Sequence, residues 1–308
     1  MWWNTENLFD TANDPLTDDD DFTPAGKLHW TEKKLTLKQM RIRHILMAVE
    51  AHPDYKKVPD ILAFAEVENR NVFQQTLNGI QGVHYKTIYY ESPDPRGIDI
   101  GLAYNPRYVT LSFSKAYSVH LADKPTRKII VAKFAVAGHL FHLILNHWPS
   151  RSFDTQWSEP KRLMAAKVTR HILDSLYLSN PLSAIITMGD FNDEPNNRSL
   201  KEILSSSFDI SKVRSQRSTI LYNCWSNYRG IGSYYYHNKW QRIDQILLSR
   251  GMLDNRGFSI SNDAFRCFSI SRMLDYSGKK PWPTYEKGEY KGGYSDHLPL
   301  LLKISITK

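Results

Sequence analysis

Apolar residues recur with helical spacing in two parts of the chain, and each part predicts a long helix. After Trp30, Thr31 could cap a helix whose inward face carries Ile42, Ile45, Leu46 and Val49. A second helix is predicted over Gln156–Leu178, with an apolar stripe formed by Leu163, Ala166, Val168, Ile172, Leu173 and Leu176. We interpret this stripe as core packing rather than as a binding surface.

Short apolar, β-branched runs bounded by Pro, Gly, Asn or Asp predict strands between and after these helices. They are Asp60–Ala65, His84–Tyr90, Ile98–Tyr104, Lys128–Val136, Leu140–Asn146, Ala184–Met188, Arg242–Leu248 and Leu298–Ile306. Trp2-Trp3-Asn4 has the pattern of the tail of another strand, so an upstream targeting segment could be missing. Two helices and many strands, with no repeat or long linker, predict one α/β domain over residues 1–308, built from two packed sheets with helices outside.

Composition and charge narrow the class of protein. Hydrophobic residues make up 41% and charged residues 23%, as in ordinary folded proteins. Forty Lys and Arg against 32 Asp and Glu give a net charge of +8, which favours polyanionic partners such as nucleic acid. The apolar run Ala132–Leu145 is too short to span a membrane and is interrupted by His139 and His142. We expect a monomer, and the compartment stays open between cytoplasmic and exported.

The two cysteines and one acidic run do not indicate a metal site. Cys224 and Cys267 are the only cysteines, which excludes a CxxC zinc site. We interpret them as separate buried thiols, although the sequence leaves a pairing between them open. The acidic run Asp18–Asp21, between Pro15 and Pro24, is typical of an exposed loop rather than a metal site.

Dense polar clusters stand where predicted strands end or begin. Burying a strand beside a carboxylate is costly unless the charge meets a metal ion or a hydrogen-bond partner. One such junction between a strand and a polar cluster would be unremarkable. Because the chain has several of them, we expect the clusters to converge on one site. The clusters contain Asn4 and Glu6, Glu66-Val67-Glu68-Asn69, Asn146-His147-Trp148, Gly189-Asp190-Phe191-Asn192-Asp193, Asp244, and Ser295-Asp296-His297.

The cluster that starts at Gly189 predicts a site for a hard cation and a phosphoryl oxygen. In extended chain, Asp190 and Asn192 would face one volume while Phe191 packs inward. Gly189 would let the backbone approach a bound group closely. The alternative is an Asx turn that merely closes the strand.

His297 is the best candidate for proton transfer near neutral pH. A catalytic histidine needs an orienting partner, and Asp244 at the head of another strand could supply it. His147, at a strand end, is a second candidate. His29, His44 and His52 are interpreted as structural.

Seven motifs, in this order, carry a resemblance to a known family. The chain resembles the endonuclease/exonuclease/phosphatase superfamily, which includes DNase I-like nucleases, abasic-site endonucleases, sphingomyelinases and inositol phosphatases. The resemblance covers essentially the whole chain, and GDFND with a terminal SDH is its most specific part. The motifs are WNTENLFD (3–10), AEVEN (65–69), RGIDIGLAY (96–104), NHWPSR (146–151), GDFND (189–193), RIDQILLS (242–249) and SDHLPL (295–300).

The resemblance implies a four-layered α/β sandwich, with two packed mixed sheets flanked by helices and a magnesium site at one rim. Glu66 would be the principal ligand of Mg²⁺, for which Mn²⁺ could substitute, with Asn4 and Glu6 close by. Asp296 would hold the metal site or the histidine backbone in place.

The same resemblance implies the roles of the remaining residues. Asp190 and Asn192 would orient the attacking water and the phosphate. His297, oriented by Asp244, would act as general base or bind the phosphate. His147 would contact the phosphate or the leaving group, with Asp99 as a candidate to polarise it.

The substrate is less clearly indicated. Inositol polyphosphate 5-phosphatases resemble one another in GDxNYR and PAWxDR elements, where this chain has GDFNDEP and KWQRID. The stretch Thr5–Phe9 departs from the abasic-endonuclease pattern. A nuclease acting on DNA or RNA is favoured; the alternatives are a phosphatase or lipid phosphodiesterase and, less favoured, a non-catalytic binding module.

Candidate substrate-binding residues are Asn146, Arg151, Tyr236 and Trp240. The aromatic and basic segment Tyr234–Trp240 could stack on bases, or it could be a β-hairpin whose tyrosines pack on the neighbouring sheet. Lys279–Pro283 and Lys287–Lys291 form a second candidate rim.

Overall fold

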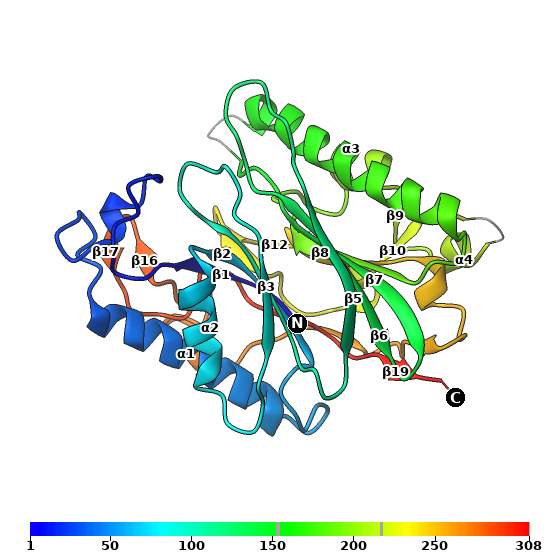
Figure 1. Cartoon of the computed structure of the whole chain (residues 1–308), viewed down its shortest axis with the longest axis horizontal. Helices are drawn as coiled ribbons and strands as arrows, with labels where there is room; N and C mark the ends of the chain where they lie inside the picture. The colour runs from blue at the N-terminus through cyan, green and yellow to red at the C-terminus, as the bar shows by residue number, and fades with distance from the viewer. Residues whose placement is uncertain (152–154, 216–217, 308) are drawn as a thin grey trace.

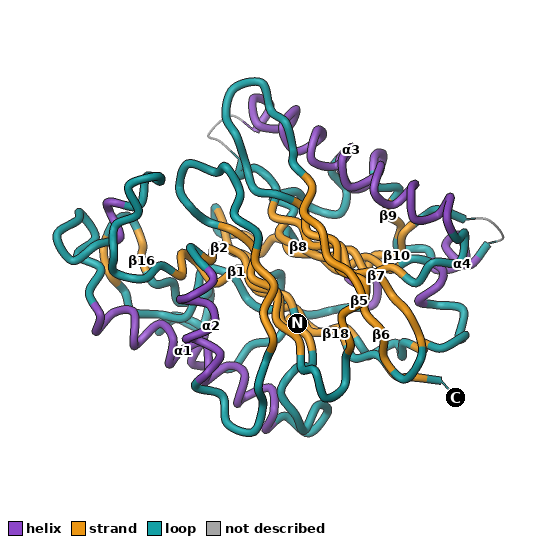
Figure 2. The backbone as a smooth tube through the Cα atoms, viewed as in Figure 1, coloured by secondary structure: helices purple, strands orange, loops and turns teal. Residues whose placement is uncertain are grey.

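Two mixed β-sheets pack face to face, with helices on their outer sides (Figures 1 and 2). The computed structural model describes residues 1–151, 155–215 and 218–307. In both views α3 lies outside one sheet, whereas α1 and α2 lie outside the other. The predicted four-layered α/β sandwich is therefore confirmed.

The first sheet has six strands and contains the amino-terminal strand near its centre. Parallel pairing joins β1 to β2, and β18 runs antiparallel on the other side of β1. The strand order is β15 (Phe265–Cys267), β18 (Leu300–Leu302), β1 (Trp2–Leu8), β2 (Ile61–Val67), β4 (Asp99–Tyr104) and β3 (Lys86–Tyr89). The helices outside it are α1 (Glu32–Ala51) and α2 (Arg70–Asn78).

The second sheet has seven strands. Its order is β5 (Thr110–Tyr117), β6 (Ile129–Val136), β7 (His139–His147), β8 (Ile185–Asp190), β13 (Asp244–Leu248), β10 (Leu221–Asn223) and β9 (Ser206–Ser207). Helix α3 (Thr155–Ser179) covers its outer face, and the short α4 (Ile210–Arg214) lies near the β9 edge. Small two-stranded pairs complete the structure: β11 (Tyr234–Tyr236) with β12 (Lys239–Gln241), β14 (Phe258–Ser259) with β19 (Ser305–Ile306), and β16 (Tyr285–Glu286) with β17 (Glu289–Tyr290).

Two apolar clusters hold these layers together. One contains Trp2, Phe64, Leu143 and Met188 together with the buried face of α1, including the predicted Ile42, Ile45, Leu46 and Val49. The other lies beneath α3 and contains Ile144, Ala166, Ile172, Leu173 and Phe191. The predicted α3 stripe therefore serves packing, because its residues are buried or partly buried against the sheet.

Several boundaries differ from the prediction. The expected last strand is divided into β18 and β19, and helices α2 and α4 were not predicted. Helix α2 is short, and the Asn69 side chain caps it by accepting a hydrogen bond from Val72 N at 2.9 Å. Strand β5 was also missed, because it lies at a sheet edge and has few buried side chains. Thr31 is the N-cap residue of α1, but its side chain makes no capping hydrogen bond.

The structure also shows the surroundings of the two cysteines and of the acidic run. Cys224 and Cys267 are buried, free thiols, as interpreted from the sequence. The acidic run lies in a mostly exposed loop with one 3₁₀ turn, Asp20–Phe22, although Asp19 itself is buried. Among the described residues, no helix is long and apolar enough to cross a bilayer.

Candidate active site

A cavity of about 430 Å³ opens at one rim of the sandwich, where the predicted polar clusters meet. It brings together residues from β1, β2, β7, β8, the β11 hairpin and the segment before β18. A larger, mostly apolar cavity of about 600 Å³ contains none of the predicted site residues. The predicted residues that line the rim cavity are Asn4, Glu66, His147, Arg151, Asp190, Asn192, Tyr236, Asp296 and His297.

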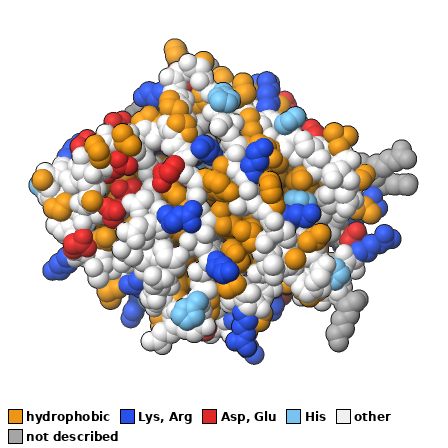
Figure 3. Space-filling view, viewed as in Figure 1, with side chains coloured by type: hydrophobic (Ala, Val, Ile, Leu, Met, Phe, Trp, Pro, Cys, Tyr) orange, Lys and Arg blue, Asp and Glu red, His pale blue; other side chains and the backbone are white. Residues whose placement is uncertain are grey.

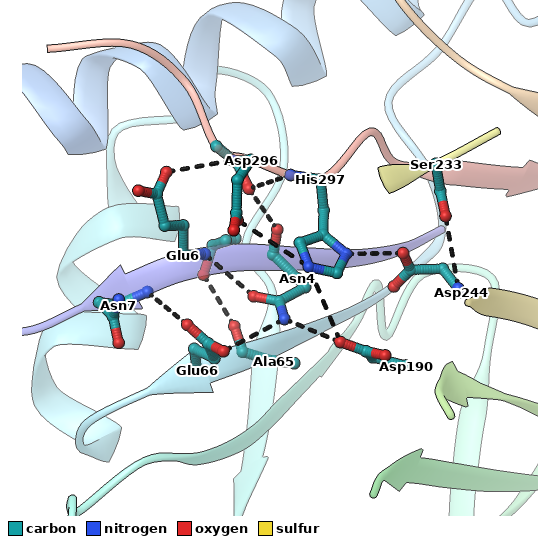
Figure 4. Close-up of polar contacts among 12 residues, drawn as sticks. Asn4, Glu6, Asn7, Ala65, Glu66, Asp190, Ser233, Asp244, Asp296 and His297 are labelled. Atoms are coloured by element: carbon teal, nitrogen blue, oxygen red, sulfur yellow. Dashed lines mark hydrogen bonds and ion pairs between the residues drawn. The ribbon is translucent and has the colours of Figure 1, made fainter. Parts of the chain in front are cut away.

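The imidazole of His297 is held by Asp244 (Figure 4). Nδ1 of His297 lies 2.7 Å from Asp244 Oδ2, and Asp244 Oδ1 accepts a hydrogen bond of 2.8 Å from Trp2 Nε1. The other ring nitrogen, Nε2, points toward the cavity side, 3.8 Å from Asp190 Oδ2 and 3.9 Å from Asp296 Oδ1. The pair therefore presents one imidazole nitrogen to the cavity and fixes the other.

Electrostatics favour a protonated His297. Burial alone would lower the pKa of His297, but the carboxylates of Asp244 and Asp296 raise it well above its ordinary value. A charged imidazole is a hydrogen-bond donor at both nitrogens. It can therefore donate to an anionic oxygen in the cavity while it remains bound to Asp244.

Asn4 joins the two carboxylates at the floor of the cavity. Its Nδ2 donates to Glu66 Oε1 at 3.3 Å and to Asp190 Oδ2 at 3.1 Å. The second Glu66 oxygen, Oε2, accepts a hydrogen bond of 3.0 Å from Asn7 N. The amide therefore fixes the separation of two acidic side chains that come from different sheets.

Backbone irregularities in β1 and β2 set the directions of the side chains beside the cavity. The β1–β2 register shifts between Asn4 and Leu8, and the β2–β4 register shifts between Ala65 and Val67. Glu6, Asn7 and Glu66 have φ values of 54°, 58° and 61°. Such left-handed residues are uncommon outside glycine, and their concentration next to a bulge is typical of functional sites.

Asp190 ends β8 and lies opposite Asp244 across the β8–β13 ladder. Burial and the neighbouring Asp244 carboxylate raise the pKa of Asp190 to about 7. A carboxyl group with such a pKa can exchange a proton near neutral pH. Asp190 is therefore a candidate for proton transfer as well as for charge stabilisation.

Asn192 reaches the cavity by a turn and not by extended chain. Its φ is 50°, and its backbone N donates to Asp190 Oδ1 at 2.9 Å. The expectation of an extended Asp190–Asn192 segment was wrong, and the Asx-turn alternative describes the backbone. Both side chains still line the cavity, while Phe191 is buried against Trp148 as predicted.

Gly189 was expected to make room for a bound group, but it makes room for β7. A Cβ atom at Gly189 would lie 2.1 Å from the backbone oxygen of Asn146. The glycine is therefore required by the close approach of two parallel strands.

His147 lies at the cavity wall as a neutral imidazole. Its Nε2 is 3.9 Å from Glu66 Oε1 and 4.0 Å from Asp190 Oδ2. Burial and the positive charge of Arg127 lower the pKa of His147 well below its ordinary value. Among the described residues, Nδ1 has no hydrogen-bond partner. Asp99 therefore does not polarise His147; it accepts hydrogen bonds from Ser92 N and the Tyr89 hydroxyl at 3.1 and 3.2 Å.

Three other predicted residues do not line the cavity. The Glu6 carboxylate accepts hydrogen bonds from three backbone N–H groups of the segment 284–296, so it is not placed as a cation ligand. Asn146 faces the opposite side of β7 from His147, and its Oδ1 accepts from Trp148 Nε1 and Thr169 Oγ1. Trp240 packs edge-on against Tyr235 within the hairpin, with ring centroids 5.4 Å apart.

The structure shows contacts that the sequence did not predict. The Tyr234 ring lies against His297, with centroids 4.6 Å apart, and Tyr234 also lines the cavity with His237 and Ser150. The aromatic pattern of the segment Tyr234–Trp240 indicated possible base stacking, but it did not predict the contact of Tyr234 with His297, because that contact joins distant segments. Lys38 is a second omission, and its position on the apolar face of the first predicted helix was the signal that could have revealed it.

The donor atoms at the cavity suit a hard divalent cation. Ligand atoms of Asp190, Asp244 and His297 lie within 4.8 Å of one another and could hold a metal ion. Asp244 is completely buried and does not line the cavity, however, whereas the side chains of Glu66 and Asp296 remain 16% and 42% exposed there. Carboxylate and amide oxygens are the ligands that Mg²⁺ and Mn²⁺ prefer. Glu66, Asp296 and Asn4 therefore form the better donor set.

A family model agrees with this arrangement. The model described as "Endonuclease/Exonuclease/phosphatase family" matches residues 1–306. The chain belongs to this family. No curated protein gives a significant match.

Solved structures of other members of the endonuclease/exonuclease/phosphatase family share the fold. The *Bacteroides thetaiotaomicron* mannosyl-6-phosphatase is 15% identical over 99% of this chain and 98% of its own, with a TM-score of 0.59. The human Nocturnin catalytic domain with bound sulfate is 16% identical, and the match covers 99% of this chain and 94% of its own, with a TM-score of 0.59. D. rerio TDP2 with a single-stranded DNA product is 14% identical, and the match covers 99% of this chain and 97% of its own, with a TM-score of 0.59. At these identities the likeness establishes the shared fold.

Proposed function

We propose that this family member is a metal-dependent phosphodiesterase that cleaves nucleic acid by in-line attack of water. The observation that carries the proposal is the Asp244–His297 pair, which faces the carboxylates of Asp190 and Asp296 across one cavity. Side chains that lie nearly three hundred positions apart meet there. No covalent nucleophile is needed for such chemistry.

Glu66 would hold the cation, together with Asp296 and the side-chain oxygen of Asn4. A bound Mg²⁺ or Mn²⁺ supplies positive charge that neutralises the phosphate and the leaving oxygen. Asn4 keeps Glu66 and Asp190 at a fixed separation through its two hydrogen bonds. The floor of the cavity is thus organised before substrate binds.

The remaining polar groups would accept the proton of the attacking water and bind the phosphate. Asp190, whose pKa is raised to about 7 by burial and by Asp244, would accept the proton of the attacking water. Protonated His297 would donate to a non-bridging phosphate oxygen. The neutral His147, which also lines the cavity, would contact the phosphate or the leaving group.

Aromatic rings beside these groups support a nucleic acid substrate. Tyr234 and Tyr236 are stacked with an interplanar angle of 17°, and the Tyr236 ring lies 4.0 Å from His237. Tyr236 is 44% exposed at the mouth of the cavity, and Arg151 provides a positive charge nearby. Exposed rings of this kind stack on unpaired bases. Lys and Arg are scattered over the face shown in Figure 3, so on that face no basic patch adds a second binding surface.

A phosphatase or lipid phosphodiesterase is the second candidate. The modest cavity volume, about 430 Å³, favours a small phosphoester over a long duplex. The mannosyl-6-phosphatase that shares this fold acts, as its name says, on such a substrate. The Lys279–Pro283 rim gives little support to either candidate, because Trp282 packs on Arg41 and Lys280 pairs with Glu286.

A substrate panel with Mg²⁺ or Mn²⁺ distinguishes these functions. We expect cleavage of single-stranded oligonucleotides that is abolished by EDTA and by His297→Ala. Release of phosphate from sugar phosphates, or of phosphocholine from sphingomyelin, with intact oligonucleotides would favour the second candidate. Absence of turnover on every phosphoester would reject both.

A further inference from the structure

Lys38 occupies the buried face of α1, where the helix otherwise presents apolar side chains. Only 2% of Lys38 is exposed, and Leu35 and Ile42 lie on the same face three and four positions away. Burying an ammonium group is costly unless its donors find acceptors and its charge finds a counter-charge. The contacts of Lys38 therefore indicate what it contributes.

The ammonium group of Lys38 joins the two ends of one loop. Nζ donates to Thr284 Oγ1 and, at 2.9 Å, to the backbone oxygen of Tyr294. Between these residues the chain makes the β16–β17 hairpin. Directly after Tyr294 it enters the Ser295-Asp296-His297 segment of the cavity. Lys38 therefore closes the loop at its base.

Glu6 binds the same two ends from the other side. Its Oε2 accepts hydrogen bonds from Thr284 N at 2.6 Å and from Asp296 N at 3.1 Å, and its Oε1 accepts from Tyr285 N at 2.9 Å. Figure 4 shows the Glu6 side chain directed toward the backbone of Asp296. Burial lowers the pKa of Lys38, and the nearby carboxylates of Glu6 and Asp296 offset part of this effect.

We propose that Lys38 and Glu6 are positioning residues, which together close the base of the 284–296 loop and so hold Asp296 at the cavity. This inference rests on the proposed function, in which Asp296 helps to hold the cation. Neither Lys38 nor Glu6 lines the cavity. Both act through the backbone of the segment that carries Asp296.

Asp296 and His297 are held in place by different contacts. His297 is held independently, because its ring binds Asp244 and its backbone oxygen accepts a hydrogen bond of 2.9 Å from Trp3 Nε1. Ser295 is held by its own hydrogen bond to Asn4 O at 2.8 Å. Opening the base of the loop would therefore displace Asp296 more than His297, and cation binding would be affected more than phosphate binding.

Lys38→Met tests the inference, because it removes the ammonium group but keeps most of the side-chain length. We expect Mg²⁺ affinity, measured by calorimetry, to fall about 10- to 100-fold, as for loss of groups that orient metal ligands. Amide hydrogens of residues 284–296 should exchange faster. The loss in Mg²⁺ affinity should not add to that of Asp296→Asn, because both changes act through one carboxylate.

Two matched variants on the same helix serve as controls. Lys33→Met removes an exposed lysine and should leave Mg²⁺ affinity unchanged. Leu46→Ala opens a cavity in the buried face and should lower Tm without changing Mg²⁺ affinity in the folded protein. If Lys38→Met does not fold, Glu6→Gln gives the same test, because it places an amide against N–H donors with little change in shape.

The outcomes distinguish this inference from the proposed function. Lower Tm with wild-type Mg²⁺ affinity and unchanged exchange of residues 284–296 in Lys38→Met or Glu6→Gln would overturn the positioning role. If the wild-type chain hydrolyses no phosphoester but Lys38→Met still weakens Mg²⁺ binding, the proposed function fails and the positioning role stands. An active enzyme with additive Lys38→Met and Asp296→Asn effects rejects the positioning role alone.

Discussion

His297 Nδ1 and Asp244 Oδ2 lie 2.7 Å apart, and Asp244 is completely buried. The carboxylate is fixed from its other side by Trp2 Nε1, so the imidazole has a single orientation relative to β1 and β13. This relationship joins the two sheets at the cavity. It also holds a positive charge beside Asp190 and Asp296, where a phosphate would bind.

Asp244→Asn should disable His297 without removing it. The variant loses the charge that raises the pKa of His297, so the imidazole would become neutral at lower pH. We expect kcat to fall by about 10²- to 10⁴-fold, the usual contribution of a positioned acid or base. NMR titration of His297 in both proteins checks the cause. An unchanged histidine pKa with wild-type kcat would contradict this role for Asp244.

Glu66→Gln should weaken the cation site. Replacing one carboxylate oxygen by an amide removes a negative charge that faces the cavity, while the hydrogen bonds with Asn4 and Asn7 N can be partly retained. We expect the Mg²⁺ concentration for half-maximal activity to rise by at least about tenfold. Glu202→Gln, at an exposed site on the π-helix Ser199–Ile203, is the matched control. Equal Mg²⁺ requirements in all three proteins would argue against Glu66 as a ligand.

The free energy of unfolding, measured in EDTA, should depend on pH because the folded state raises the pKa of Asp190. Its folded pKa, about 7, is above the ordinary value of 3.8, so the folded state binds the proton more tightly than the unfolded state. This contribution is fully present below about pH 4 and is lost as the pH rises through about 7. Asp190→Asn should therefore reduce the decline in unfolding free energy between pH 4 and 7 by roughly a few kcal/mol. Urea unfolding at several pH values measures it, and parallel curves for both proteins would refute the shift.

Tyr236→Ala should impair binding of single-stranded nucleic acid selectively. Loss of one stacking ring costs roughly 1–3 kcal/mol per base, so KM for an oligonucleotide should rise about 5- to 150-fold. The rate on a small phosphodiester without a base should be nearly unchanged. Tyr276→Ala is the control, because Tyr276 is fully exposed and does not line the cavity. Equal losses on both substrates would show that Tyr236 supports the cavity itself.

The main catalytic candidates could be predicted because each one ends or begins a strand. Glu66, Asp190, His147 and His297 stand beside apolar runs whose burial the sequence makes plain. A carboxylate at such a junction needs a partner, and that requirement is visible without coordinates. The two-sheet fold could be predicted for the same reason, since most of its strands are apolar runs.

The errors have different structural causes. The family resemblance implied Glu6 beside Asn4 at the metal site, but the left-handed residues of the β1 bulge turn the Glu6 carboxylate toward Thr284. Asn146 was placed with His147, although alternate strand residues face opposite sides. Tyr234 gains its position from a contact with a distant segment, which no local pattern reports, whereas the place of Lys38 on the apolar face of α1 was a local signal.

The rate of single-stranded oligonucleotide cleavage as a function of Mg²⁺ concentration, in the wild-type protein and in His297→Ala, tests the central claim most directly. The account predicts saturable, EDTA-sensitive cleavage by the wild-type protein. It also predicts a loss of at least about 10²-fold in His297→Ala at every Mg²⁺ concentration, with circular dichroism unchanged. Cleavage by the wild-type protein that is indifferent to Mg²⁺, or that survives in folded His297→Ala, would contradict it.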